Sequence, residues 1–200
     1  MQIQIEGWED GHPFKRTLDV LDRWAVHNSL RVVVKACGTE VSIKQSPGAL
    51  SEQRAGVGAC LWDASFVLTA FLGAPSHSAW HWVKGSVEVV ELEWGQPNSM
   101  QVIDSLRGQS PDFVIAADCL YIDEGGSTPK VDHFVDACAA LCGSFTQCFV
   151  ALEQRSTSVM QAFFMKTRNA GFHVERMRAN AEMMSLQAEH IVVLKLTKTD

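Results

Sequence analysis

The stretch PDFVIAADCLY, residues 111–121, decides the fold. Residues 112–118 form a short and nearly all-apolar run, which is typical of a strand buried on both faces of a parallel sheet. The run ends at Asp118, and an acidic loop that contains glycine follows over residues 122–127. Because ligands of open α/β sheets bind at the carboxyl ends of the strands, we expect a binding site beside Asp118.

Strands and helices alternate along the chain after this run. Thr128 and Pro129 suit the start of a helix, and apolar residues recur at helical spacing from there to Gly143. The remaining pattern predicts a strand over 145–152, a helix over 158–169 and strands over 172–178 and 191–196. This alternation indicates an α/β layer fold whose last two strands form an antiparallel pair.

The part before residue 111 predicts a hairpin and a helix. Residues 30–35 and 40–44 flank Gly38, which supplies the turn of the hairpin. Residues 60–72 predict a helix that ends at Gly73. Residues 1–28 show a mixed pattern, and we interpret them as an N-terminal appendage.

The composition indicates one globular domain. The chain has 200 residues, 46% of them hydrophobic and 20% charged, which is enough for one buried core and unlike a disordered or collagen-like chain. Its net charge of -6 gives no attraction for nucleic acid or for an acidic membrane surface. This charge suits a basic protein partner better.

The cysteines and the absence of targeting patterns bear on the compartment. Residues 1–8 lack the apolar core of a signal peptide, and no apolar run reaches the roughly 20 residues that span a bilayer. Several of the six cysteines lie in apolar runs, where a reduced cysteine behaves as a small hydrophobic residue. We therefore expect a reducing compartment, the cytoplasm or the nucleus.

Four side chains flank the predicted ligand edge of the sheet. A carboxylate at Asp118 can hold an ammonium group, and the phenol of Tyr121 can orient an amine or accept its proton. Asp118 is equally well explained as a cap at the strand end, and Tyr121 as a packed residue. Trp62 and Trp94 offer flat surfaces for stacking on a ring or covering a cation, although each tryptophan taken singly is more often a core residue.

A metal site is disfavoured. His133, Cys138 and Cys142 lie near one another on the predicted helix, but the two cysteines belong to its apolar stripe and no second pair with ligand spacing follows. We expect the core role for both cysteines and no metal. The sequence also contains no phosphate-binding loop and no Ser/His/Asp signature.

Four motifs resemble one known family. GVGACLWDAS (56–65), VELEWG (90–95), PDFVIAADCLY (111–121) and EQR (153–155) are similar to motifs of the seven-β-strand protein-lysine methyltransferases of the methyltransferase-like 21 group, within methyltransferase family 16. The resemblance is greatest to the branch that acts on valosin-containing protein, and it runs in order from about residue 30 to residue 195. It implies a methyltransferase-like domain over residues 29–200, behind the appendage of residues 1–28.

The resemblance implies a Rossmann-like seven-β-strand fold and S-adenosyl-L-methionine as cofactor. In the family, the residues matched by Trp62, Trp94 and Ala117 contact the cofactor. Asp118 and Tyr121 match the D-x-x-Y motif, which lines the place where the substrate lysine enters. The implied partner is a protein substrate, with the AAA ATPase valosin-containing protein as candidate and with no nucleic acid or membrane partner.

The sequence departs from the family before residue 86. The family places a strand ending in E-L-G-x-G-x-G, a helix, a strand ending in an acidic residue and a second helix ahead of the strand that ends in L-x-W-G. Here Gly85 is followed directly by that last strand, and none of the 14 glycines forms the loop. Compared with the family, the fold thus lacks its first βαβα unit, on the order of 50 residues, at the position of residues 85–86.

Two hypotheses follow from this gap. The first is a protein-lysine N-methyltransferase with a rebuilt cofactor site. The second is a catalytically inactive splice form or incomplete gene model that acts at most as a protein-binding module. Leaving three or four buried backbone groups unpaired costs about 1 to 3 kcal/mol each, which rivals the stability of a domain. We therefore expect residues 87–94 to pair beside residues 112–118, or the chain to fold poorly.

Overall fold

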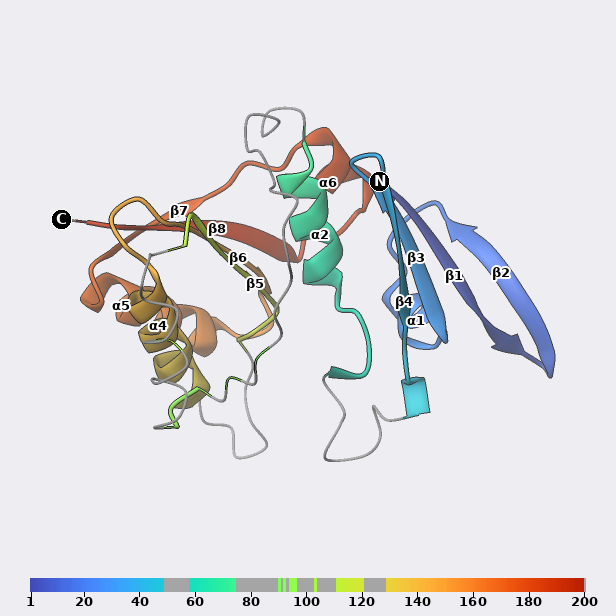
Figure 1. The fold of residues 1–200 in the computed structure, drawn as a ribbon, viewed down its shortest axis with the longest axis horizontal. Coiled ribbons are helices and arrows are strands. Elements are labelled where there is room, and N and C mark those ends of the chain that lie inside the picture. Colours follow the sequence, from blue (N-terminus) through green and yellow to red (C-terminus); the bar gives the residue numbers. More distant parts are fainter. Residues whose placement is uncertain are drawn as a thin grey trace. The chain divides into compact units, whose positions relative to one another are not determined.

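The structure divides into two compact units. The computed structural model describes residues 1–48, 58–74, 90, 92, 94–96, 103, 111–120 and 129–199. The N-terminal unit comprises Met1–Trp80 and Ala179–Glu189, and the C-terminal unit comprises His81–Arg178 and His190–Asp200. Each unit contains its own four-stranded sheet (Figure 1). The expected mixed α/β class is confirmed.

The sheet of the N-terminal unit is antiparallel throughout, in the order β2-β1-β3-β4. Its strands are β1 (Gln2–Glu9), β2 (His12–Leu18), β3 (Arg31–Ala36) and β4 (Thr39–Lys44). The hairpin predicted around Gly38 is confirmed as β3 and β4, with Cys37 and Gly38 in the turn. A two-residue turn of this kind matches the twist of the strands that it joins.

Residues 1–28 are part of this sheet. Asp10 and Gly11 both have positive φ angles, 51° and 79°, and form the tight turn between β1 and β2. Strand β1 also pairs with β3, from Gln2 opposite Lys35 to Glu6 opposite Arg31. The predicted boundary between residues 28 and 29 therefore lies between β1 and β3, which are hydrogen-bonded to each other in one sheet.

The described helices of the N-terminal unit are α1 (Arg23–His27), α2 (Asp63–Leu72) and α6 (Ala181–Ser185). The predicted helix over residues 60–72 is present, but it begins at Asp63 because the backbone of Trp62 is extended. Asn180 accepts a hydrogen bond from the backbone of Met183 and so caps α6, and its amide donates to the Ala70 carbonyl at 3.1 Å. This amide joins α6 to α2.

The sheet of the C-terminal unit has the order β5-β6-β8-β7. Its strands are β5 (Phe113–Ala117), β6 (Gln147–Glu153), β7 (Phe172–Arg176) and β8 (Ile191–Lys198). Strand β5 runs parallel to β6, whereas β8 is antiparallel to both β6 and β7. The predicted antiparallel pair of final strands is confirmed.

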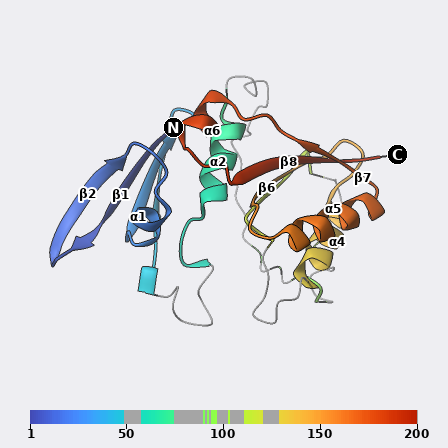
Figure 2. The same cartoon turned by 180° about the vertical axis from the view of Figure 1, so that it is seen from behind.

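Two helices, α4 (Pro129–Leu141) and α5 (Thr157–Asn169), cover one face of this sheet. Figure 1 and Figure 2, which are opposite views, both show α4 and α5 on the same side of the sheet. The apolar stripe predicted from helical spacing is buried and consists of Val131, Phe134, Val135, Cys138 and Cys142. It packs with every second residue of β6, from Cys148 to Leu152, which makes it the centre of the core.

The expected burial of β5 on both faces is wrong. Val114 and Ala116 pack against the core, but Ile115, on the opposite face, keeps 47% of its surface exposed. Among the described strands, β5 pairs with β6 alone. The partner strand expected over residues 87–94 lies outside the described residues except for positions 90, 92 and 94.

The length and polarity of a helix decide whether it can span a membrane. In the part of the chain that the structure describes, every helix is too short or too polar to span a membrane.

Candidate functional site

The site begins where β5 ends. The backbone N–H of Asp118 donates to the Ala151 carbonyl at 2.8 Å and so continues the hydrogen bonding with β6 beyond Ala117. Asp118 has a φ angle of 53°, in the left-handed region, which aspartate adopts more readily than most residues. The chain therefore turns sharply off the sheet at Asp118, at the edge where the sequence predicts a ligand.

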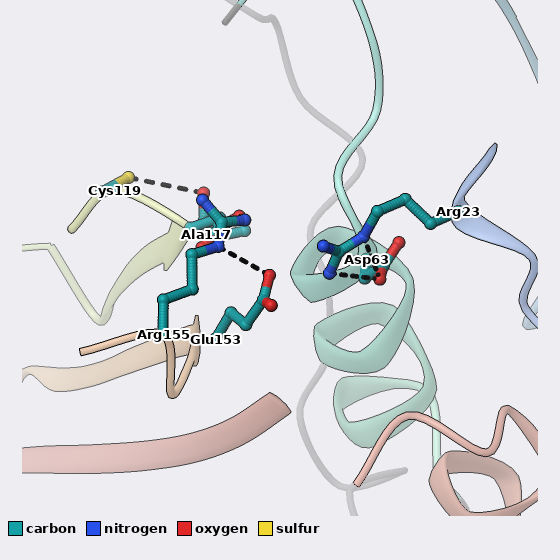
Figure 3. Close-up of polar contacts among 7 residues, drawn as sticks. Arg23, Asp63, Ala117, Cys119, Glu153 and Arg155 are labelled. Carbon is teal, nitrogen blue, oxygen red and sulfur yellow. Dashed lines mark hydrogen bonds and ion pairs between the residues drawn. The ribbon is translucent and has the colours of Figure 1, made fainter. Parts of the chain in front are cut away.

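Asp118 is held in an ion-pair network with β6. An Arg155 guanidinium nitrogen lies 2.6 Å from Asp118 Oδ2, and Arg155 Nε donates to Glu153 Oε2 at 2.7 Å. The side chains of Asp118, Glu153 and Arg155 are 4%, 15% and 37% exposed. Figure 3 shows Arg155 and Glu153 side by side. The bond from the guanidinium to the buried carboxylate is thus a short charge-assisted hydrogen bond.

The role of Arg155 was missed by sequence reasoning. Residues 153–155 carry part of the family resemblance, but no function follows from their types or spacing. The pairing spans 37 residues and depends on the parallel register that sets Ala117 opposite Ala151. A Glu-x-Arg sequence at the end of the strand next to Asp118 is the signal that could have found it.

The chain turns back into the core immediately after Asp118. Cys119 Sγ contacts the Ala117 carbonyl oxygen at 3.5 Å (Figure 3), and Leu120 is only 4% exposed. Burial raises the pKa of the Cys119 thiol, and the neighbouring Asp118 carboxylate acts in the same direction. Ala117 and Asp118 are therefore the residues that lie at the strand end itself.

The raised pKa of Cys119 predicts slow alkylation. The thiolate is the reactive form, so iodoacetamide at neutral pH should modify the exposed Cys37 well before Cys119. Peptide mass spectrometry of the native protein measures both rates, and raising the pH should narrow the difference. Equal rates in urea serve as the control, whereas equal rates in the native protein would contradict the burial of Cys119.

Trp94 is partly a core residue. Its indole meets the ring of Phe134 in α4 edge to face, with ring centroids 5.1 Å apart. Gly95 has a φ angle of 86°, and a Cβ there would lie 2.8 Å from the His133 ring. The turn formed by Trp94 and Gly95 is thus closed against α4. Through this contact Trp94 packs against the core. Its role in cofactor binding stays a prediction.

Trp62 belongs to the N-terminal unit. It is half-buried directly ahead of α2, with its ring 4.7 Å from that of His27 in an edge-to-face contact. The next residue, Asp63, is 3% exposed, and Arg23 reaches its Oδ2 at 2.8 and 2.9 Å (Figure 3). These contacts fix the position of Trp62 within its own unit. Within the C-terminal unit, Ala117 and Asp118 are adjacent at the end of β5, and Tyr121 lies outside the described residues.

The buried cysteines do not indicate a metal. Cys138 and Cys142 are 3% and 4% exposed, which confirms their core role. A hydrogen bond with the Cys148 thiol raises the pKa of Cys142, and burial adds to this shift. Within the described ranges, no group of three or more His, Cys, Asp or Glu residues could hold a metal ion.

The described residues do not provide a cradle for S-adenosylmethionine. Such a cradle needs glycines where the backbone closely approaches the cofactor. In the C-terminal unit, the glycines with positive φ are Gly95 and Gly171 over the described positions. Gly95 is closed by His133, and Gly171 lies in the turn between α5 and β7, where its carbonyl accepts from Thr199.

Part of the chain matches the model of one protein family. Compared with curated proteins, the chain has no match. Residues 77–170 match the model of a family described as lysine methyltransferase, and this range contains Trp94, Ala117, Asp118 and Tyr121 as well as Arg155. The part of the chain that holds Asp118 at the end of β5 is therefore related to lysine methyltransferases.

Proposed function

We propose that the chain is a homologue of S-adenosylmethionine-dependent protein-lysine N-methyltransferases, with a Rossmann-like seven-β-strand fold shortened by its first βαβα unit. The observation that carries this proposal is Asp118. Its carboxylate is buried, paired with Arg155 and positioned at the carboxyl end of β5, within the range that matches the family. This is the edge of a parallel sheet where ligands bind.

Asp118 and Tyr121 are assigned to the lysine side of the site. The Asp118 carboxylate binds the ammonium group of the substrate lysine and orients it, and the Tyr121 phenol directs the amine after its proton is lost. Such chemistry needs alignment and desolvation more than it needs a strong base. Trp62, Trp94 and Ala117 are assigned to the cofactor side, where S-adenosylmethionine supplies the methyl group when it is bound.

A second function has support of its own. No stretch of the sequence matches the glycine-rich loop of the family, and the described positive-φ glycines of the C-terminal unit, Gly95 and Gly171, lie in separate turns. The 200-residue chain then holds the cofactor weakly. Under this alternative it is a catalytically inactive splice form or incomplete gene model that acts at most by binding a protein.

The substrate and compartment are proposed from the sequence. A lysine methyltransferase of this group acts on a protein, and the resemblance points to valosin-containing protein. Six free cysteines suit a cytoplasmic or nuclear protein, where thiols stay reduced.

Asp118→Ala should abolish any methyl transfer that the chain performs, because the substrate ammonium loses its anchor. The measurement is transfer of labelled methyl from S-adenosylmethionine to purified valosin-containing protein, with the Asp118→Asn variant retaining the shape but not the charge. Asp132→Ala is the matched control, since this α4 carboxylate is 57% exposed. Unchanged transfer by Asp118→Ala would remove Asp118 from the site. Absence of transfer by the parent chain would favour the second function.

A further inference from the structure

One face of the N-terminal sheet carries a row of charges across all four strands. Lys15, Glu6, Arg31 and Lys44 are cross-strand partners in turn. Directly opposed residues of antiparallel strands lie on the same face, so the four side chains form a transverse row. With three cations and one anion, the row has a net charge of +2, opposite in sign to the chain as a whole at -6.

The single anion of the row is neutralised within it. Lys15 Nζ lies 2.8 Å from Glu6 Oε1, and Arg31 Nε lies 3.4 Å from Glu6 Oε2. The hydrogen bond from Lys15, the largest influence, lowers the pKa of Glu6, so Glu6 is charged at neutral pH. Arg31 also donates to Ser42 at 2.8 Å, which fixes its guanidinium on this face. The row therefore keeps its net positive charge at neutral pH, and its ion pairs hold Lys15 and Arg31 in place.

An open groove of about 680 Å³ runs along this row. Its apolar lining is Trp8, Pro13, Phe14 and Leu30. Trp8 lies opposite Pro13 in the register and is 63% exposed, and Leu30 is 45% exposed. An exposed indole beside apolar neighbours is unusual on a soluble surface and is the residue type that most often anchors a protein interface.

The row is ordered before a ligand binds. Glu6 holds both Lys15 and Arg31, and Ser42 also accepts a hydrogen bond from Arg31. Ordering these side chains before a ligand binds lowers the entropic cost of binding.

We propose that this groove docks an acidic, extended segment of a protein partner, with apolar side chains on Trp8 and its cross-strand partner Pro13 and carboxylates opposite Arg31 and Lys44. A carboxylate is the group that a guanidinium recognises most specifically. A long polyanion such as nucleic acid would interact with the whole protein, and the overall negative charge disfavours it. Salt screens charges beyond a Debye length of about 8 Å, so a short acidic segment is attracted by the nearby row. The basic partner suggested by net charge alone would be repelled at this place.

This inference goes beyond the proposed function. Every residue of the groove precedes residue 46, outside the range of 77–170 that matches lysine methyltransferases. It requires neither S-adenosylmethionine nor Asp118. Failure of methyl transfer therefore leaves it standing, and failure of docking leaves the proposed function standing.

The test uses the full chain and a fluorescein-labelled peptide in which glutamate alternates with leucine and phenylalanine. Fluorescence anisotropy should show saturable binding that weakens with added salt. Trp8→Ala and Lys44→Glu should each weaken it by about tenfold or more. The matched controls are Trp24→Ala, an equally exposed tryptophan at 72%, and Lys35→Glu, because neither residue lines the groove. Both controls should bind as the parent chain does.

Four results would overturn the proposal. The first is equal binding of a matched peptide with lysine in place of glutamate. The second is equal loss of binding in Trp8→Ala and Trp24→Ala. The third is no binding by a parent chain that has the circular dichroism of the folded state. The fourth is tighter binding of a single-stranded oligonucleotide of the same charge, which would assign the row to nucleic acid.

Discussion

Replacing Phe163 with alanine should lower the free energy of unfolding by about 3 to 5 kcal/mol. Phe163 is fully buried in α5, and its ring centroid lies 6.4 Å from that of Phe134 in α4. The side chain thus joins both helices at the centre of the core beneath β6. Removing it leaves a cavity that the surrounding helices and strands fill only partly. Urea unfolding followed by circular dichroism measures the loss.

The next residue of the same helix provides the control. Phe164 is 42% exposed, so Phe164→Ala removes the same atoms from a surface position. Its cost should stay below about 1 kcal/mol. Similar losses for the two variants would mean that α5 does not pack on the sheet through Phe163.

Arg155→Met should be the second most damaging change, with a loss of about 2 to 3 kcal/mol. It removes the cation from two carboxylates, of which Asp118 is only 4% exposed. A buried charge without its counter-ion costs more than the pair contributes. We place the value at the lower end for buried pairs because Arg155 itself is 37% exposed.

A double-mutant cycle isolates this pair. Asp118→Asn removes the charge that Arg155 balances, so adding Arg155→Met to it should cost clearly less than Arg155→Met alone. Arg176→Met, at an exposed arginine of β7, should change stability by no more than about 0.5 kcal/mol. Additive losses at residues 118 and 155 would show that the two side chains do not interact in solution.

The C-terminal unit was predictable because its signals are local. The stripe from Val131 to Cys142 repeats at the helical period between Pro129 and Gly143, and the structure buries all of it. The strands around it are short apolar runs that end at polar residues. Burial of β5 was not predictable, since the pattern shows that a strand is apolar but not which strand lies beside it.

The hairpin of β1 and β2 was missed although its signal is present. Ile3 and Ile5 alternate with polar residues, and Asp10-Gly11 is among the strongest two-residue turn sequences. The charged face of these strands, with Glu6 and Lys15, made the segment look irregular. The same charged residues line the groove that we propose as a docking site for an acidic segment.

The position of Asp118 was predictable from the sequence, but its partner was not. Asp118 follows from its place at the end of an apolar run, and the structure puts it there. Its pairing with Arg155 depends on the register of two strands joined by a long crossover, which no local pattern encodes. Trp94 shows the reverse case, because the family resemblance assigns it to the cofactor while the structure also packs it on Phe134.

The central proposal is that a chain whose sequence contains no match to the glycine-rich loop binds no methyl donor, and the described residues show no glycine-rich loop. Isothermal titration calorimetry of the purified chain with S-adenosylmethionine tests it most directly. A variant that carries a glycine-rich strand, loop and helix from a related methyltransferase between Gly85 and Ser86 is the positive control. We expect saturable binding for that variant and heats of dilution alone for the parent chain, whereas saturable micromolar binding by the parent chain would contradict the claim.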